Sequence, residues 1–197
     1  ISGTASAAIS GAVSANGANA AVTIDSTDTT IGSDITANGK GAKVTAKNIG
    51  KLDGDVTTDA DGSVELNFKE GAAWSGDNGG NTTMSLSKGT WNGANTGKLN
   101  ATLTNGASWT GDNAGNTTMS LSKGSWNGAN TGKLNATLTN GTSWTGDSSG
   151  AGSTIKLDAS TWNGINSGAK ADITLTNGAS WSKGNTADGV TVKADKA

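Results

Sequence analysis

The chain has 197 residues, of which 31 are glycine and only 4% are aromatic, and it contains no Cys, His, Pro or Tyr. Its 14 basic residues are all Lys, and its 16 acidic residues bring the net charge to −2. This composition excludes disulfides and thiolate metal sites and gives no electrostatic footprint for nucleic acid or anionic lipid. We therefore expect no cofactor, no nucleic-acid partner and, because apolar runs are short, no membrane insertion by this segment.

Residues 1–70 carry a pattern of two beats. Apolar-x-apolar triplets at residues 22–24, 44–46 and 64–66 alternate with a large aliphatic residue that glycine follows closely. Alternation of apolar and polar residues predicts short strands with one buried face. Glycine, asparagine and aspartate between the beats predict turns. The aliphatic residues of the second beat are Ile9, Ile31 and Leu52.

Residues 71–177 repeat this pattern with tryptophan in the second beat. Residues 71–105 and 106–140 are nearly identical blocks of 35 residues, and 141–177 is a diverged third copy. Each block holds two copies of the pattern, the seven tryptophans lie 17 to 19 residues apart, and residues 178–197 form one last copy. Such a short and steady period is typical of a solenoid, in which each repeat is one coil that packs against its neighbours.

We therefore predict an all-β fold, a single β-solenoid over residues 1–197 that is a parallel β-helix of about ten coils of 17–22 residues. Because tryptophan replaces Ile and Leu at the same beat, we expect the indoles to point inward; an exposed aromatic row for sugar stacking is the alternative. The triplet leucines extend the same core. The expected core ladder is Ile9, Ile31, Leu52, Trp74, Trp91, Trp109, Trp126, Trp144, Trp162, Trp181, Leu86, Leu103, Leu121, Leu138, Leu157 and Leu175.

Polar residues repeat as regularly as the apolar ones and suggest an interaction face. Aspartates follow the tryptophan motif in every second coil, which separates like charges by about 9.6 Å, or two strand spacings. Hydroxyl residues fill the outward positions of the triplets. A solvated face of good strand formers is the ordinary interpretation, and ice binding is a minor alternative. The candidate interaction residues are Asp77, Asn78, Asp112, Asn113, Asp147, Thr102, Thr104, Thr137, Thr139, Thr174 and Thr176.

Neither a metal site nor an active site is expected. Asp53, Asp55, Asp59 and Asp61 are close in sequence, but their spacing lacks the register of an EF-hand, so ordinary turns are the preferred interpretation. Without His, Cys, Arg or Tyr the chain lacks the usual general base, nucleophilic thiol and bidentate anion clamp. A carboxylate pair for glycoside cleavage is the remaining catalytic alternative, and we predict that the protein is not an enzyme.

The repeated phrases, such as residues 103–111 and 31–36, resemble the passenger region of bacterial autotransporters, particularly the self-associating adhesins, over roughly residues 9–192. The resemblance implies a right-handed parallel β-helix that is exported through an outer-membrane barrel and displayed outside the cell. It also implies adhesion, autoaggregation or biofilm formation, often with sugars on Ser or Thr. No signal-peptide pattern begins the sequence, so we expect this chain to be a passenger segment.

Two functions follow as hypotheses. The first is a non-catalytic adhesive rod on the bacterial outer-membrane surface, whose partners are a second copy of itself or the glycans and proteins of another cell. Weak polar contacts repeated on every coil would sum to useful avidity. The second is a passive stalk or a filament-forming spacer, because the number of near-identical blocks sets the length of a rod.

Overall fold

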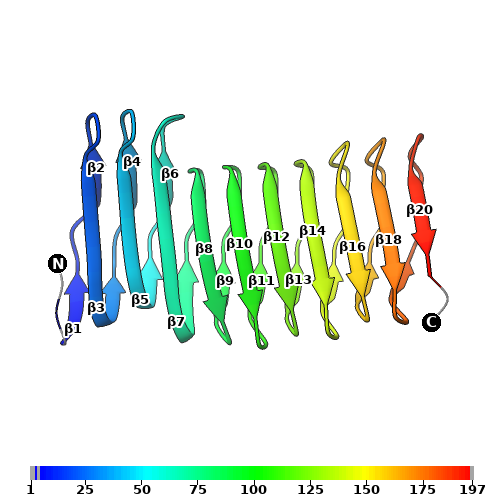
Figure 1. Ribbon diagram of the computed structural model, residues 1–197, viewed down its shortest axis with the longest axis horizontal. Helices are drawn as coiled ribbons and strands as arrows, with labels where there is room; N and C mark the ends of the chain where they lie inside the picture. Colours follow the sequence, from blue (N-terminus) through cyan, green and yellow to red (C-terminus); the bar gives the residue numbers. More distant parts are fainter. Residues whose placement is uncertain (1–2, 4, 196–197) are drawn as a thin grey trace.

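The computed structural model describes residues 3 and 5–195, and it confirms the predicted fold: an all-β rod of ten stacked turns (Figure 1). The N-terminus and the C-terminus lie at opposite ends of the rod. Every strand pair in the described residues is parallel, as expected when each strand pairs with its equivalent in the next coil. These residues form no helix, and so none that could cross a membrane. The handedness implied by the resemblance stays a prediction.

One row of strands contains the apolar-x-apolar triplets, and we call it the triplet row. It lies in front in Figure 1, where the chain runs downward along it. Successive members keep exact residue-to-residue register from coil to coil, for example Leu103 with Leu86 and Leu121. Its strands are β3 (Ala21–Ile31), β5 (Lys43–Asp53), β7 (Ser63–Ser75), β8 (Thr82–Ser87), β10 (Leu99–Thr104), β12 (Thr117–Ser122), β14 (Leu134–Thr139), β16 (Thr154–Asp158), β18 (Asp172–Thr176) and β20 (Thr191–Ala194).

A second row carries the tryptophans and is called the tryptophan row. The long strands β3, β5 and β7 run through both rows with register shifts, so the two rows form one sheet of 17 strands. From β8 onward the two rows are separate strands. The remaining members of the tryptophan row are β1 (Ser6–Ile9), β9 (Thr90–Asn92), β11 (Ser108–Thr110), β13 (Ser125–Asn127), β15 (Ser143–Thr145), β17 (Thr161–Asn163) and β19 (Ser180–Ser182).

The third side of the rod changes along its length. In the first three coils it is a small sheet of β2 (Val13–Asn16), β4 (Ile35–Asn38) and β6 (Val56–Thr58). Beyond Val56 it narrows to one bridging residue in each coil, beginning with Asn78 and Asn95. The later coils are correspondingly shorter, and Figure 1 shows the first three reaching higher than those that follow.

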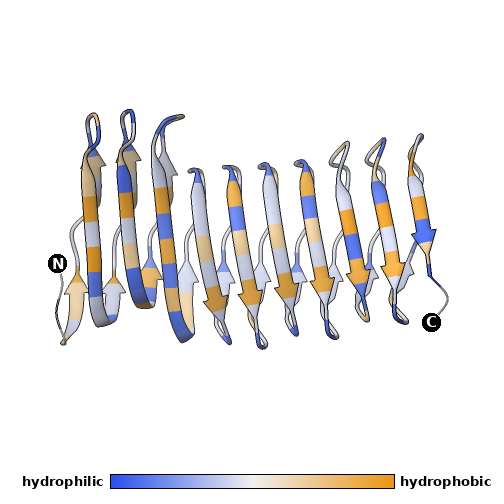
Figure 2. Cartoon of the chain, in the orientation of Figure 1, coloured by the Kyte–Doolittle hydropathy of each residue, from blue (hydrophilic) through white to orange (hydrophobic). Residues whose placement is uncertain are grey.

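The core is a thin interior that runs along the rod between these sides. Hydrophobic and hydrophilic residues alternate along the strands of the triplet row (Figure 2), and the inward ones are buried. Leucines of the triplets at 86, 103, 121, 138 and 157 are at most 1% exposed, as are Ile31 and Leu52. Ile9, Leu175 and Trp181 of the core ladder are only partly buried. Ile9 and Trp181 lie on strands that have a neighbouring strand on one side only, and Leu175 lies beside the last strand of the described chain.

Alternate coils fill this interior in two ways, which explains the doubled repeat. In the triplet row Met84, Ala101, Met119 and Ala136 are register partners, so a large and a small side chain alternate. Two positions earlier the order is reversed, because Thr82, Leu99, Thr117 and Leu134 are partners there. A coil with Thr and Met therefore packs against coils with Leu and Ala. Since interiors are close-packed, this alternation keeps each layer filled.

Candidate functional site

The tryptophans form one continuous stack inside the rod. Neighbouring indole rings from Trp74 to Trp181 are 4.5–4.8 Å apart between centroids and within 7° of parallel. Six of the seven, all but Trp181, are at most 1% exposed. The indoles therefore lie in the core and do not form an exposed row that could stack on sugars.

Each indole N–H also binds the preceding coil, which explains the Trp-x-Gly motif. Nε1 of Trp109 donates to the carbonyl oxygen of Gly93 at 2.9 Å, and the other six tryptophans make the same bond to the equivalent glycine. A Cβ on Gly111 would lie 1.9 Å from the Gly93 oxygen, and Gly111 has a φ of 149°. Glycine is thus required where the coils approach most closely.

Two of the candidate interaction residues are inside the rod, and the prediction was wrong for them. Asn78 and Asn113 are 0% exposed and belong to a ladder of side-chain amides on the third side. Asn78, Asn95 and Asn113 each donate through Nδ2 to Oδ1 of the asparagine in the next coil. The distance is 2.6 Å from Asn78 to Asn95 and from Asn95 to Asn113, and 2.7 Å from Asn113 to Asn130. Buried amides must be hydrogen-bonded, and stacking identical coils supplies the partners.

The ladder was missed because asparagine in a glycine-rich stretch has the same sequence pattern as a turn. The available signal was the spacing of Asn78, Asn95, Asn113 and Asn130, which repeats the period of the tryptophans. Asn78 occupies in its coil the position that the aliphatic Val56 has in the third coil. The ladder is therefore a structural element and not a contact surface.

The alternate aspartates are exposed, but each is already engaged. Oδ1 of Asp77 accepts the backbone N–H of Ala94 at 2.7 Å, and Asp112 and Asp147 accept the equivalent N–H groups of the next coils at 2.8 Å. One carboxylate oxygen of each side chain thus closes the corner between two coils. These residues brace the corner while they present charge to solvent on every second coil.

The outward side of the triplet row holds polar side chains that have no partner among the described residues. Among residues 3 and 5–195, no hydrogen bond engages the side chains of Thr102, Ser120 or Thr137. A neighbouring column is equally free in this part of the chain. Strand register places these residues side by side at about 4.8 Å. The free columns are Thr102, Ser120 and Thr137, and Thr83, Asn100, Thr118 and Asn135.

The third outward column of this row is partly used to brace a corner. Asn140 donates through Nδ2 to the hydroxyls of Ser122 and Thr139, and Asn105 donates to Ser87. Thr176 donates to the carbonyl oxygen of Leu157 at 3.4 Å. Of the candidate threonines, Thr139 and Thr176 are therefore engaged, whereas Thr102 and Thr137 are not; Thr104 and Thr174 also lie on the outward side and are half-buried.

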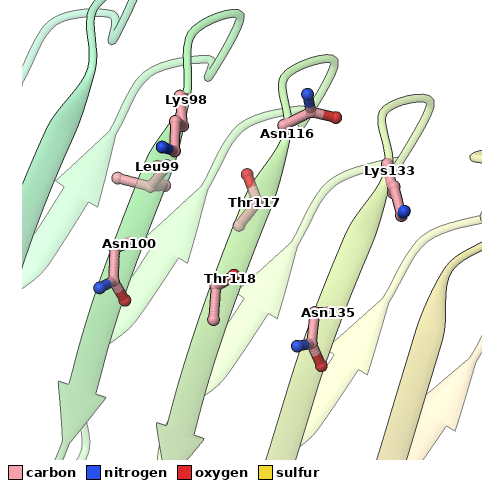
Figure 3. Close-up of a pocket in the computed structure, with 8 residues that line it drawn as sticks. All are labelled: Lys98, Leu99, Asn100, Asn116, Thr117, Thr118, Lys133 and Asn135. Carbon is pink, nitrogen blue, oxygen red and sulfur yellow. The ribbon is translucent and has the colours of Figure 1, made fainter.

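A shallow groove crosses the upper ends of β10, β12 and β14 (Figure 3). It has a volume of about 380 Å³. Lys98, Asn116 and Lys133 lie at its upper rim, and polar side chains of the same strands lie below them in the figure. The lining residues are Lys98, Leu99, Asn100, Asn116, Thr117, Thr118, Lys133 and Asn135.

Charges are arranged differently at the N-terminal end. All five ion pairs of the described residues use acidic groups from positions 25 to 70, as in Lys43–Glu65 at 2.8 Å. The hydrogen bond from Lys43, together with one from Asn67, lowers the pKa of Glu65. Lys98 and Lys133 take part in no ion pair within residues 3 and 5–195.

The four clustered aspartates do not converge. Asp53 pairs with Lys51, Oδ1 of Asp55 accepts the backbone N–H of Asp77 at 2.8 Å, and Asp59 accepts the N–H groups of Gly39 and Gly62. No group of three His, Cys, Asp or Glu side chains that could hold a metal ion occurs among the described residues. Asp55 and Asp59 thus bind backbone N–H groups at turns and corners, as the ordinary interpretation of the sequence expects.

Comparison with known proteins gives no further guide to the site. No family model matches the chain, and neither the curated proteins nor the solved structures provided a match.

Proposed function

We propose that the protein is a non-catalytic, extracellular β-solenoid that acts in adhesion or self-association through its repeated polar faces. The observation that carries the proposal is the pair of free columns on the triplet row, from Thr83 to Asn135 and from Thr102 to Thr137. These hydroxyls and amides have no partner within the described chain, and they recur on successive coils. Unengaged donors and acceptors in a flat, regular array fit another array or a glycan of similar repeat.

Multivalency supplies the strength of such a contact. A single exposed hydrogen bond contributes little, because water competes for the same groups. A rigid rod holds many of these groups at fixed spacing, so each contact after the first forms at high effective concentration. The stacked indoles and the amide ladder make the scaffold rigid, and display at the cell surface would let many rods act together.

The test uses matched threonine substitutions on two sides of the rod. Thr102→Val with Thr137→Val removes two hydroxyls from the free column and keeps the β-branched shape that suits a strand. Thr110→Val with Thr145→Val makes the same change at exposed positions of the tryptophan row, with the same 35-residue spacing. Protein-coated beads would be assayed for clumping and for attachment to cells, and sedimentation would report association in solution.

We expect the first pair of substitutions to reduce clumping or attachment and the second pair to leave both unchanged. Wild-type protein that stays monomeric at high concentration and whose beads bind neither each other nor cells would contradict the proposal. An equal effect of the two pairs would show that hydroxyls on this face have no special role.

A second function, a spacer, is favoured by the interchangeable blocks. Ala101 lies between Met84 and Met119, and Ala136 lies between Met119 and Ile155. Each alanine therefore has a large side chain on both sides, and removing residues 106–140 would place Ala101 between Met84 and Ile155. Copy number could then change the length of the rod without new contacts. Deleting this block separates the two functions, because a spacer only shortens whereas an adhesin loses binding in proportion to the face removed.

A further inference from the structure

The lysines of the groove are placed at a regular interval. Leu99, Thr117 and Leu134 are register partners, so the residues just before them, Lys98, Asn116 and Lys133, follow one another along the rim. Figure 3 shows these three at the tops of their strands. Two strand spacings separate the lysines, roughly 10 Å, with an uncharged amide between them.

This part of the surface is positive, and no acidic side chain is among the residues that line the groove. Neither Lys98 nor Lys133 is in an ion pair of the described chain. The acidic groups lie at its edges: Asp59 lines a second hollow together with Lys98, Glu65 is the register partner of Thr83, and Asp158 is on β16. The outward residues between them are all Thr, Ser or Asn: Thr83, Ser85, Ser87, Asn100, Thr102, Thr104, Thr118, Ser120, Ser122, Asn135, Thr137 and Thr139.

We propose that this groove binds an acidic polysaccharide in which charged and uncharged sugars alternate. A sugar unit of an extended chain advances by roughly one strand spacing, so one unit would face each coil. Carboxylates on every second sugar would then meet Lys98 and Lys133, while the sugar between them meets Asn116. The amides of Asn100 and Asn135, unengaged in the described chain, would bind sugar hydroxyls. The inference rests on the proposed adhesive function and names its ligand class.

Nucleic acid, the other common polyanion, fits this groove less well. Base stacking on single strands needs exposed aromatic rings, and the tryptophans are stacked inside the rod. The chain has no arginine for bidentate contacts with phosphate. Lysine as a compact point charge, flanked by amides and hydroxyls, suits carboxylates carried by a hydroxyl-rich chain.

The experiment measures binding of hyaluronan oligosaccharides, which carry a carboxylate on every second sugar, to the folded chain by calorimetry at low salt. The double variant Lys98→Gln, Lys133→Gln is expected to weaken binding about tenfold, the effect of losing two exposed charge contacts. The control is Lys88→Gln with Lys123→Gln, which removes two lysines with the same 35-residue spacing at the opposite end of the strands, one of them paired with Glu70, and should leave affinity unchanged. Added salt should weaken wild-type binding, because it screens exposed charges.

Several outcomes would overturn the inference. Equal losses in the two double variants would indicate general charge attraction, and equally tight binding of a DNA oligonucleotide or of neutral chitin oligosaccharides would remove the specificity. Tighter binding of polygalacturonate, which is charged on every sugar, would contradict the alternation. Clumping of coated beads is measured on the same samples: absent hyaluronan binding with retained clumping removes this inference alone, whereas absent clumping removes the proposed function.

Discussion

The first three coils and the later coils solve the same packing problem with different chemistry. In the first three, aliphatic residues such as Ile31, Ile35 and Leu52 fill the interior from three sheet-forming sides. In the later coils, tryptophan replaces the aliphatic residue of the second beat, and asparagine replaces Val56 on the third side. A larger side chain and an amide ladder thus accompany a shorter coil. A narrower coil can therefore be filled and held together by stacked rings and side-chain hydrogen bonds in place of a third sheet.

The two regions meet at one joint. Leu52 is the register partner of Trp74, and Phe68 lies 6.1 Å from the Trp74 ring at an interplanar angle of 22°. Phe68 thereby covers the first indole, which has no tryptophan before it. The change of chemistry is therefore made within a single coil, by an aromatic residue that the aliphatic coils do not otherwise contain.

The largest effect is expected from breaking the indole stack in its middle. Trp109→Ala should reduce the free energy of unfolding by about 3–5 kcal/mol, because it leaves a cavity between Trp91 and Trp126. Trp109→Leu, which copies Leu52, should cost less but still destabilise, because the carbonyl oxygen of Gly93 loses its donor. Urea unfolding followed by near-ultraviolet circular dichroism measures both. Equal stability of Trp109→Leu and wild type would show that stacking and the indole hydrogen bond add nothing to aliphatic packing.

A deletion of one coil should be more harmful than a deletion of two. Removing residues 106–123 would place Ala101 against Ala136 and Leu99 against Leu134, so the large and small side chains no longer alternate. The lost methionine layer should cost about 2–4 kcal/mol beyond the loss of a coil. Removing 106–140 keeps the alternation and serves as the control, although it shortens the rod more.

Both deletion variants would be unfolded in urea and compared with the full chain. The alternation of core volumes would lose its importance if the variant lacking 106–123 were as stable as the variant lacking 106–140.

Breaking the amide ladder should have an intermediate effect. Asn113→Val, which copies Val56, removes the acceptor of Asn95 and Thr117 and the donor to Asn130. Leaving buried polar groups without partners costs about 1–3 kcal/mol each, so we expect a loss on the order of 3 kcal/mol in urea unfolding. Val56→Asn makes the opposite exchange at the edge of the aliphatic region and serves as the comparison. If Asn113→Val were as stable as the wild type, the packing of the short coils, and not the pairing of the amides, would hold the third side together.

The fold followed from the sequence because period and alternation are properties of the chain itself. Ten coils, parallel strands and the inward tryptophans all derive from spacings that can be counted, and each later coil repeats its neighbour's environment. The candidate site was harder. Asn78 and Asn113 have the polarity and glycine-rich surroundings of a turn, and only the stacking of coils turns them into buried partners.

The hydrogen bonds of Asp77, Asp112 and Asp147 could not be predicted from the sequence for a related reason. Each accepts a backbone N–H from the next coil, a contact between residues about one coil apart that residue type alone does not indicate. The groove at Lys98 and Lys133 depends on strand register, which sets residues of three coils side by side. Contacts within a coil are thus visible in the sequence, whereas contacts between coils need the register.

The smallest effect is a gain, at the one place where the ladder changes residue. Ser148 takes the position of an asparagine: it accepts Nδ2 of Asn130 at 3.1 Å, but the next amide, Asn166, has a buried Oδ1 without a partner among the described residues. The shorter side chain does not reach it. Ser148→Asn should restore both bonds and stabilise the protein by about 1 kcal/mol, the usual net value of a hydrogen bond.

Ser148→Ala is the matched variant for this gain, because it removes the hydroxyl that Asn130 now uses and should destabilise. Thermal and urea unfolding of the three proteins would rank them as Asn above Ser above Ala at position 148. An asparagine that lowers stability would mean that the interior around Ser148 has repacked to exclude an amide. The diverged third block would then differ from the first two in its packing as well as in its hydrogen bonds.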